Sequence, residues 1–241
     1  MRSRFHDRQF ACAYEKRLSA EGYPGVLLDI VLEEIDEGRT IIDVGAGTGF
    51  FSIPLARMGY RVIAIEPSPE MVKLFMEKIN EQFSQLVSLN CIDWESWHKD
   101  RGDNLICIHS IYGMQNIDAA IKKMSCFSNK SILIIKAGSG TKSLSEIICK
   151  SLNIKRGYSD FFYKIEMILQ KNGLKYRHRR IEQRRNYIFI DLNKEAEYYC
   201  KRLDIDKGKL DVVKKIIESS CQRDGDRYVF QGVYKDILFV F

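Results

Sequence analysis

The chain has 241 residues, of which 45% are hydrophobic and 29% are charged, and its formal net charge is +6. This composition is sufficient for the core of an α/β domain, and no apolar run approaches the ~20 residues that a membrane-spanning helix needs. The polar N-terminus predicts no signal peptide. Seven cysteines without a C-x-x-C pair and four isolated histidines predict reduced thiols, no metal site and a cytoplasmic protein.

Residues 1–39 are expected to form an N-terminal helical cap. Helices are predicted over Asp7–Leu18 and Pro24–Ile35, and the second carries apolar side chains at helical spacing, which predicts one buried face. Gly38 is expected to mark the end of this segment before the first strand.

From residue 40 onward, short apolar strands alternate with helices. The strand Leu105–Ile108 is continuously apolar, as expected for a central strand that is covered on both faces. The other predicted elements are a first strand ending near Val44, helix Phe50–Met58, strand Arg61–Glu66, helix Pro69–Phe83 with Ser68 as its N-cap, strand Val87–Ile92, helix Ile117–Cys126, strand Ile132–Ile135, and helices within Ser143–Leu152 and Ser159–Lys171. This alternation predicts an α/β fold with a doubly wound, mostly parallel sheet, in which ligands bind at the carboxyl ends of the strands.

The C-terminal third departs from a minimal sheet. Its predicted elements are strands Leu174–Ile181 and Tyr187–Asp191, helices Lys194–Leu203 and Lys209–Ser220, and a last strand Val233–Phe241. Between Leu174 and Arg185, six lysines and arginines accompany one acid. Such a strip can attract phosphates. We favour an edge strand that its charges protect from aggregation, because no aromatic residues interleave with the arginines.

The most informative segment is Thr40–Leu55, TIIDVGAGTGFFSIPL, in which an acid and three alternating glycines follow a short apolar strand. Glycine is needed where a tight turn requires positive φ or where a ligand lies against the backbone. The second strand ends in Glu66, which can accept hydrogen bonds from ribose hydroxyls. A dinucleotide fingerprint would require glycine where Phe50 stands, and there is no P-loop motif. The segment therefore predicts a pocket for an adenosine-containing cofactor.

The pattern D-x-G-x-G-x-G resembles motif I of the class I S-adenosylmethionine-dependent methyltransferases. The segment RVIAIEPSPEM and the N-terminal helices are most similar to the subgroup described as methyltransferase type 11 or 12. The resemblance covers residues 40–137. It implies a seven-stranded, Rossmann-like sheet whose last strand inserts antiparallel beside the fifth. Residues 40–241 are then expected to form the methyltransferase domain, with a helical insertion at 193–231.

The resemblance also implies which residues bind S-adenosylmethionine. In the family, the glycine loop packs against the methionine part of the cofactor, and the acid after the second strand holds the ribose. The implied cofactor-binding residues are Asp43, Gly45, Ala46, Gly47, Gly49, Glu66, Pro67, Ser68, Met71, Asp93, Trp94, His109 and Tyr14. His109 and Tyr112 follow the fourth strand, where motif IV faces the methyl donor and acceptor, and they are the candidate catalytic residues. A core role for Trp94 and His109, ordinary packing for Tyr14 and a sheet-capping role for Tyr112 stay open as alternatives.

Methyl transfer from a sulfonium mainly needs alignment of the nucleophile with the methyl group and exclusion of water. A general base is needed where the acceptor must lose a proton. The fourth strand ends in HSIYG rather than in the [DN]-P-P-[FYW] signature of enzymes that methylate adenine, cytosine or glutamine amides. We therefore expect methyl transfer to a small molecule, with no membrane partner. An RNA or ribonucleoprotein methyltransferase that uses residues 175–185, and a catalytically silent cofactor-binding module, are the alternatives.

Overall fold

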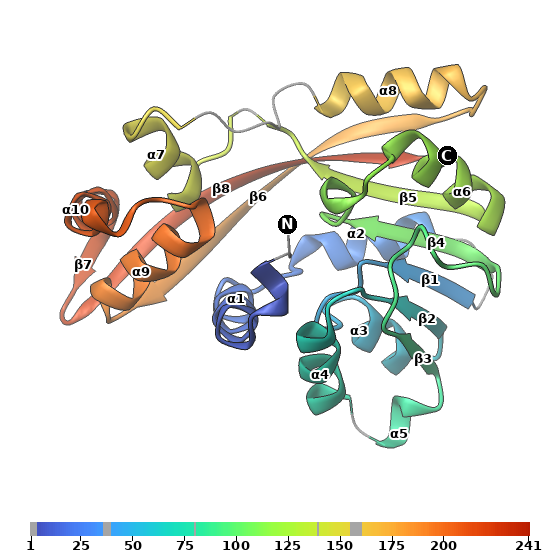
Figure 1. The fold of residues 1–241 in the computed structure, drawn as a ribbon, viewed down its shortest axis with the longest axis horizontal. Helices are drawn as coiled ribbons and strands as arrows, with labels where there is room; N and C mark the ends of the chain where they lie inside the picture. The colour runs from blue at the N-terminus through green and yellow to red at the C-terminus, as the bar shows by residue number, and fades with distance from the viewer. Residues whose placement is uncertain (1–3, 36–39, 80, 139, 155–160) are drawn as a thin grey trace.

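A computed structural model describes residues 4–35, 40–79, 81–138, 140–154 and 161–241 of the chain. Its centre is a sheet with the strand order β3-β2-β1-β4-β5-β8-β6, and a short strand, β7, pairs with β8 (Figure 1). The strands are β1 Thr40–Val44, β2 Arg61–Ile65, β3 Val87–Asn90, β4 Gly102–Ile108, β5 Ser128–Lys136, β6 Arg177–Phe189, β7 Gln222–Asp224 and β8 Arg227–Val240. The pairs among β1 to β5 are parallel, and β8 runs antiparallel to β5, β6 and β7.

The doubly wound, mostly parallel sheet that the sequence predicts is confirmed, and so is the antiparallel last strand beside the fifth. The expected count of seven strands is short by one, because the described residues form an eight-stranded sheet. The additional strand is β7, whose three residues pair with the start of β8. It is too short and too polar, with the sequence QRD, to show a strand pattern.

Helices cover both faces of the sheet. The helices of the described residues are α1 Arg8–Ala20, α2 Val26–Glu34, α3 Ser52–Arg57, α4 Pro69–Lys78, α5 Glu81–Ser84, α6 Ile117–Phe127, α7 Leu144–Ser151, α8 Phe161–Lys171, α9 Leu192–Leu203 and α10 Leu210–Ser220, with 3₁₀ turns η1 Arg4–His6, η2 Ile111–Gly113 and η3 Lys207–Lys209. Side chains of a strand alternate between its two faces. Accordingly, Ile106 and Ile108 pack with α2 and α3, while Leu105 and Cys107 pack with α6 and α8. The central strand is therefore apolar on both faces from Leu105 to Ile108.

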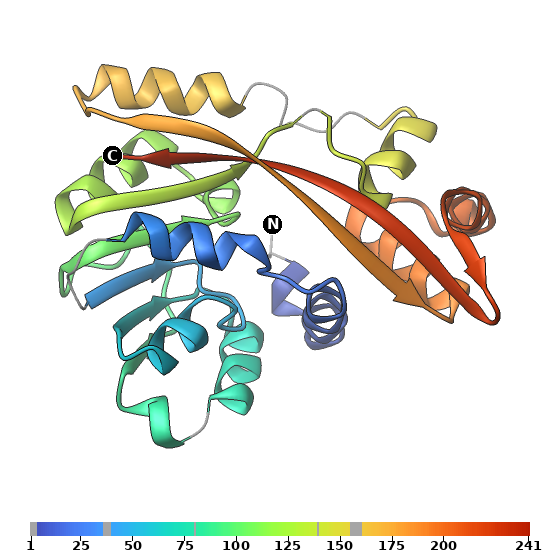
Figure 2. The same cartoon turned by 180° about the vertical axis from the view of Figure 1, so that it is seen from behind.

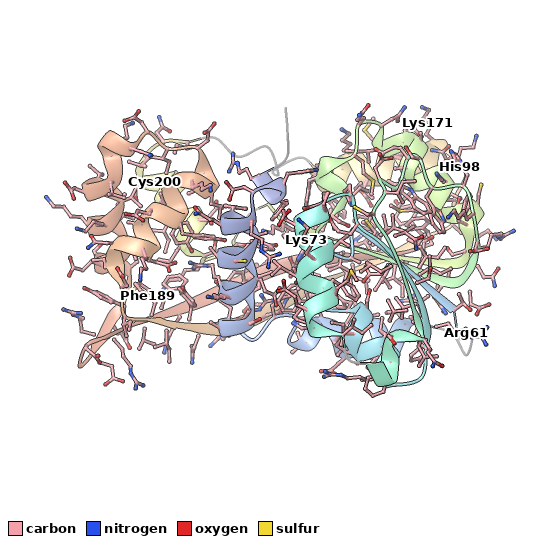
Figure 3. All side chains as sticks on the ribbon, turned by 60° about the horizontal axis from the view of Figure 1, so that its bottom comes forward. Arg61, Lys73, His98, Lys171, Phe189 and Cys200 are labelled. Carbon is pink, nitrogen blue, oxygen red and sulfur yellow. The ribbon has the colours of Figure 1, made fainter. Side chains whose placement is uncertain are left out.

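Strands β6 and β8 are much longer than the others and run together beyond the sheet (Figure 1). Their far ends, with β7, α7, α9 and α10, form what we call the ribbon module. Figure 3 shows Phe189 and Cys200 in this part of the molecule, well away from Lys73 on α4. The module has its own core, which contains Leu144, Ile148, Tyr187, Phe189, Ala196, Tyr199, Cys200, Val213, Ile217, Tyr228 and Phe230.

The prediction of two separate strands before the ribbon module is wrong, because β6 is continuous from Arg177 to Phe189. The intervening residues 182–186, EQRRN, are polar and break the apolar alternation. Each nevertheless pairs with a residue of β8, from Glu182 opposite Lys235 to Asn186 opposite Gln231. A ribbon that is covered on one face only tolerates polar side chains on the other.

The N-terminal segment forms two helices, close to the predicted boundaries. Asp7 is the N-cap of α1, since its side chain accepts a hydrogen bond of 2.8 Å from the Phe10 amide. Helix α1 lies between the ribbon module and α4, whereas α2 lies against the sheet (Figures 1 and 2). Gly38 and Ser159 lie outside the described residues.

The seven cysteines are free thiols. Within the described residues, no helix combines the length and the apolar character that crossing a membrane requires.

Candidate functional site

The glycine turn between β1 and α3 is the centre of the candidate site. Gly45, Gly47 and Gly49 have φ angles of 75°, 57° and 86°, a region that L side chains rarely adopt. The amides of Gly45 and Ala46 both donate to the Ile65 carbonyl, at 2.8 and 3.0 Å. These bonds fix the turn against the end of β2.

The three glycines serve different purposes. A β-carbon at Gly45 would lie 2.3 Å from the Ser110 β-carbon, and one at Gly49 would lie within 2.9 Å of Phe75 and Ile53. At these two positions the protein itself leaves no room for a side chain. At Gly47, no described atom lies within 4 Å of the β-carbon position. Gly47 therefore presents bare backbone to open space, as a turn that cradles a ligand must.

Glu66 follows β2 and faces this turn. Its Oε2 accepts from the Gly47 amide at 2.9 Å, and its Oε1 accepts from the Ser68 amide at 2.8 Å. The residue is 7% exposed. Burial raises the pKa of the Glu66 carboxyl, although the two amide hydrogen bonds act in the opposite direction. Each carboxylate oxygen has a second lone pair, so the group can still accept from ligand hydroxyls.

Asp43 is buried directly beneath the turn. Its Oδ2 accepts a 2.6 Å hydrogen bond from the Ser52 hydroxyl at the start of α3. Burial raises the pKa of Asp43 to about 7, and the nearby charge of Glu66 acts in the same direction. Asp43 thus connects β1 to α3 rather than presenting a carboxylate to solvent.

The N-terminal segment covers this region. The Ser68 hydroxyl caps α4 by accepting from the Met71 amide at 3.3 Å, as predicted, and donates to the Phe5 carbonyl at 2.6 Å. Tyr14 is packed 5.0 Å from the Phe5 ring, in a cluster that includes Met71. Burial raises the pKa of Tyr14 to about 12, so its hydroxyl stays protonated. The η1 turn and α1 therefore place Phe5 and Tyr14 beside the start of α4, next to Ser68 and Met71.

A second contact joins α1 to the glycine turn. The Thr48 hydroxyl donates to Oε2 of Glu15, and the Lys78 ammonium lies 2.7 Å from the other oxygen of this carboxylate. Thr48 is 2% exposed. The sequence did not indicate Glu15 as a site residue, because nothing local distinguishes it from other acids on an amphipathic helix.

The predicted cofactor-binding residues that follow β2 and β3 differ in their exposure to solvent. Pro67 is exposed, and so is Asp93, whose carboxylate accepts from the Ser96 amide at 2.7 Å. This hydrogen bonding lowers the pKa of Asp93. Trp94 is 3% exposed, lies in the core beside α6, and donates from its indole nitrogen to the Ala120 carbonyl at 3.2 Å. The structure thus places Trp94 in the core and Asp93 at the surface.

His109 lies at the carboxyl end of β4, next to the glycine turn. It is one of the non-glycine residues with positive φ, 57°, and its amide donates to the Ile134 carbonyl at 2.9 Å. The neighbouring Ser110 hydroxyl donates to the Val44 carbonyl at 2.6 Å, immediately before Gly45. These bonds hold the His109 backbone beside the turn.

The His109 ring is held by a buried polar chain. Its Nε2 lies 2.9 Å from Oδ1 of Asp236, which is 3% exposed and belongs to β8. The other Asp236 oxygen accepts from the Gln183 amide nitrogen at 2.9 Å, and the Gln183 oxygen accepts from Nε and Nη2 of Arg185 at 3.2 and 2.8 Å. Burial raises the pKa of Asp236, but the charge and hydrogen bond of His109, with Lys136 and Arg185, outweigh it and keep the pKa below its ordinary value.

Tyr112, the second predicted catalytic residue, lies apart from this chain. Its hydroxyl oxygen accepts from the Lys136 amide at 2.5 Å, and its ring lies 4.9 Å from Phe161 at the start of α8. It packs against the core on the α6 and α8 face. His109 instead approaches Tyr23, which precedes α2 on the other face, with 6.2 Å between the ring centres.

Asp236 and Gln183 were not predicted from the sequence as site residues. A signal was present, because Asp236 is a lone acid followed by the apolar run Ile237–Val240. A buried acid in a central strand requires a partner. The sequence could not name that partner, because His109 lies 127 residues away.

The basic strip on β6 is partly neutralised. Arg177 pairs with Glu34, and Arg179 pairs with Glu33 at 2.8 Å and with Glu34 at 3.6 Å. Both acids belong to α2. Since β6 is the last strand in the order of the sheet, these pairs support the interpretation of the strip as a charged edge strand.

Residues 41–127 match the family model described as "Methyltransferase domain". A protein of Methanosphaera stadtmanae, named as a probable ribosomal RNA small subunit methyltransferase A, is 39% identical over 54 residues, which are 22% of this chain and 20% of that protein. An uncharacterized methyltransferase of Bacillus velezensis is 32% identical over 76 residues, 32% of each chain. The matched segments therefore span a third or less of these relatives.

The fold is similar to solved methyltransferase structures. The phosphoethanolamine N-methyltransferase 2 of Haemonchus contortus, solved with phosphomonomethylethanolamine and S-adenosylhomocysteine, superposes with a TM-score of 0.63. The identity is 16%, and the superposition covers 97% of this chain and 57% of that one. At this level of identity, the similarity concerns the fold.

Proposed function

Because this chain contains a class I S-adenosylmethionine-dependent methyltransferase domain, we propose that it transfers a methyl group from S-adenosylmethionine to a small-molecule acceptor in the cytoplasm. The observation that carries the proposal is the open backbone at Gly47 beside the buried carboxylate of Glu66. A parallel sheet binds its ligand at this position, outside the carboxyl ends of neighbouring strands.

The residues around the turn fit the cofactor. Gly47 leaves room for the methionine part against the backbone, and Glu66 can accept from ribose hydroxyls while two amides hold it in place. Pro67, Ser68 and Met71 follow at the start of α4, where we propose that they flank the adenine. Tyr14 and Glu15 on α1 would close the site above the turn.

When bound, the cofactor supplies an electrophilic methyl group on a sulfonium that leaves as a neutral thioether. The protein then has to align the acceptor, exclude water and, where necessary, take a proton. His109 is the described group best suited to take it, because an imidazole can gain and release a proton near physiological pH and this one lies beside the glycine turn. This role supports an acceptor with a hydroxyl or another proton-bearing nucleophile.

Titration calorimetry with S-adenosylhomocysteine tests the proposal. Gly47→Val should weaken binding about 5- to 100-fold, since the side chain would enter the space of the ligand. Gly225→Val is the matched control. Gly225 has nearly the same φ, 62° against 57°, and no described atom within 4 Å of its β-carbon position, but it lies in the β7–β8 turn of the ribbon module.

Equal loss of binding in both glycine variants would mean that backbone strain, not the ligand site, causes the effect. Glu66→Gln should weaken binding by about tenfold or more, because it places an amide donor against a backbone amide and removes the charge. If the folded wild-type protein does not bind S-adenosylhomocysteine, the proposed function is wrong.

The alternative of an RNA or ribonucleoprotein methyltransferase is favoured by the remaining basic side chains of β6, such as Arg180 and Arg184, which are exposed. It predicts RNA affinity that falls steeply with salt. The pairing of Arg177 and Arg179 with α2 weighs against it. A gel-shift titration between about 50 and 200 mM salt, the interval over which counterion release is conspicuous, separates the two. Retained cofactor binding without transfer to a metabolite panel would indicate a silent module.

A further inference from the structure

We propose that Asp236, Gln183 and Arg185 are positioning residues that hold His109 in one tautomer, with the proton on Nε2, so that Nδ1 is the atom that accepts the proton of the acceptor. This inference rests on the proposed function and deepens it. It assigns the basic atom and three residues on β6 and β8 that act through His109.

The chain of hydrogen bonds has one consistent direction. Arg185 has donors only, so the Gln183 atom that it contacts through Nε and Nη2 must be the amide oxygen. The Gln183 NH2 group therefore points at Asp236, 2.9 Å away. An ionised carboxylate accepts only, so the bond between Asp236 and His109 needs its proton on Nε2.

The direction of this hydrogen-bond chain is fixed at the end that Arg185 occupies. The Arg185 guanidinium carbon lies 5.0 Å from the centre of the Tyr23 ring and 4.9 Å from that of Tyr234, so two aromatic rings contact the cation. Gln183 and Asp236 are 5% and 3% exposed. Since the chain is buried, reversing its direction would leave charged or amide groups without partners, at a cost that water cannot offset.

The other ring nitrogen remains available. Among the interactions of the described residues, none engages Nδ1 of His109, and the side chain is 16% exposed. Tyr23, whose ring lies 6.2 Å from that of His109, also contacts Phe50 in the glycine turn at 5.1 Å. Nδ1 is therefore the imidazole atom through which His109 can meet an acceptor beside the turn.

The proposed step is balanced. The proton of an acceptor hydroxyl passes to Nδ1, and His109 becomes an imidazolium whose positive charge the Asp236 carboxylate stabilises. A lone pair of the acceptor oxygen forms the new bond to the methyl carbon. The electron pair of the broken carbon–sulfur bond stays on the sulfur of the cofactor. The imidazolium then loses its proton to solvent. Asp236 stays ionised throughout, as in other carboxylate–histidine pairs.

The tautomer can be measured without knowing the acceptor. In protein labelled with 15N-histidine, the ring signals of His109, identified by their loss in His109→Gln, should show at alkaline pH a proton on Nε2 and a bare Nδ1. Asp236→Asn should reverse this. Since Gln183 still donates to position 236, the Asn oxygen must face Gln183, its NH2 group must face His109, and the proton must move to Nδ1.

The double variant Asp236→Asn with Gln183→Glu tests the direction of the chain. The carboxylate introduced at position 183 accepts from the Asn NH2 group and still pairs with Arg185, so the Asn oxygen again faces His109 and the proton should return to Nε2. This rescue keeps the test informative if the single variant folds poorly. His178 on β6, which lies 3.7 Å from Glu166 on α8, is the internal control, and its tautomer should not change.

A wild-type His109 with its proton on Nδ1, or a tautomer that is the same in all three proteins, would overturn the proposal. Titration with S-adenosylhomocysteine reports separately on the proposed function. Asp236 and Gln183 have no hydrogen bond to the glycine turn or to Glu66 among the described contacts. Binding should therefore stay within about twofold of wild type in the double variant, and its loss in wild type would refute the cofactor site without altering the tautomer result.

Discussion

The buried carboxyl of Asp43 should make the stability of the protein depend on pH, and Asp43→Asn should remove that dependence. In the folded protein, burial raises the pKa of Asp43 from its usual 3.8 to about 7. The folded state therefore binds this proton more tightly than the unfolded state does. The resulting stabilisation is fully present below pH 3.8 and is lost as the pH rises through about 7.

The size of the effect follows from the two pKa values. Between them, the free energy of unfolding falls by about 1.4 kcal/mol for each pH unit. From pH 5 to pH 8, the wild-type protein should therefore lose at most about 3 kcal/mol relative to Asp43→Asn. The Asn oxygen can still accept the hydrogen bond from Ser52, so the variant keeps the local contact and loses only the titrating group.

Guanidinium denaturation at pH 5 and pH 8, followed by the fluorescence of the buried Trp94 and Trp97, measures both stabilities. Glu66 is present in both proteins, so only the part of its titration that is coupled to Asp43 enters the comparison. If the two proteins lose the same stability between the two pH values, Asp43 is ionised in the folded state and the account of its burial is wrong.

Three further changes follow from particular contacts. Gly45→Ala puts a β-carbon 2.3 Å from that of Ser110 at a φ of 75°, which should lower the free energy of unfolding, measured by heat or denaturant, by about 3 kcal/mol. Adding Ser110→Gly to this variant should recover part of the lost stability, and no recovery would contradict the clash. Arg17→Met leaves the buried acids Glu21 and Glu195 without their cation and should cost about 3–5 kcal/mol, whereas a cost below about 1 kcal/mol would show that the pair is not desolvated. Ser68→Ala removes the cap of α4 and the contact with Phe5; it should cost about 1 kcal/mol and speed hydrogen exchange of the Met71 amide, and unchanged exchange would mean that the cap does not hold the helix end.

The parts of the fold that could be predicted are those fixed by local rules. The glycine turn is readable because a strand that turns tightly into a helix needs positive φ at fixed spacing, and Ser68 before Pro69 is readable as an N-cap. Helices α9 and α10 were predicted because each is amphipathic over its length. The direction and place of β8 came from the family resemblance rather than from the residues of the strand.

The relations that could not be predicted join residues far apart in the chain. Asp236 meets His109 because β8 pairs with β5 in the register that sets Asp236 opposite Lys136, next to the carboxyl end of β4. A shift of that register by one residue would turn Asp236 to the other face. The continuity of β6 was missed for a related reason, since its polar centre is satisfied by pairing with β8 and not by its own sequence pattern.

The strands and helices of the ribbon module connect it to His109 and, through α1, to the glycine turn. Strand β8 carries Asp236, which reaches His109, and two residues earlier Tyr234, whose hydroxyl donates to Glu21, the C-cap residue of α1, at 3.1 Å.

From the other side, Glu195 of α9 pairs with Arg17 of α1, whose guanidinium lies 4.1 Å from the centre of the Tyr187 ring of β6. The same helix α1 places Glu15 on Thr48 in the glycine turn. Separating the ribbon module from α1 would break the buried ion pair of Arg17 with Glu195, at a cost of about 3–5 kcal/mol. Helices α9 and α10 and strand β7 lie between β6 and β8 in the sequence and leave the order of the sheet intact, while α9 gives α1 a second surface to bind.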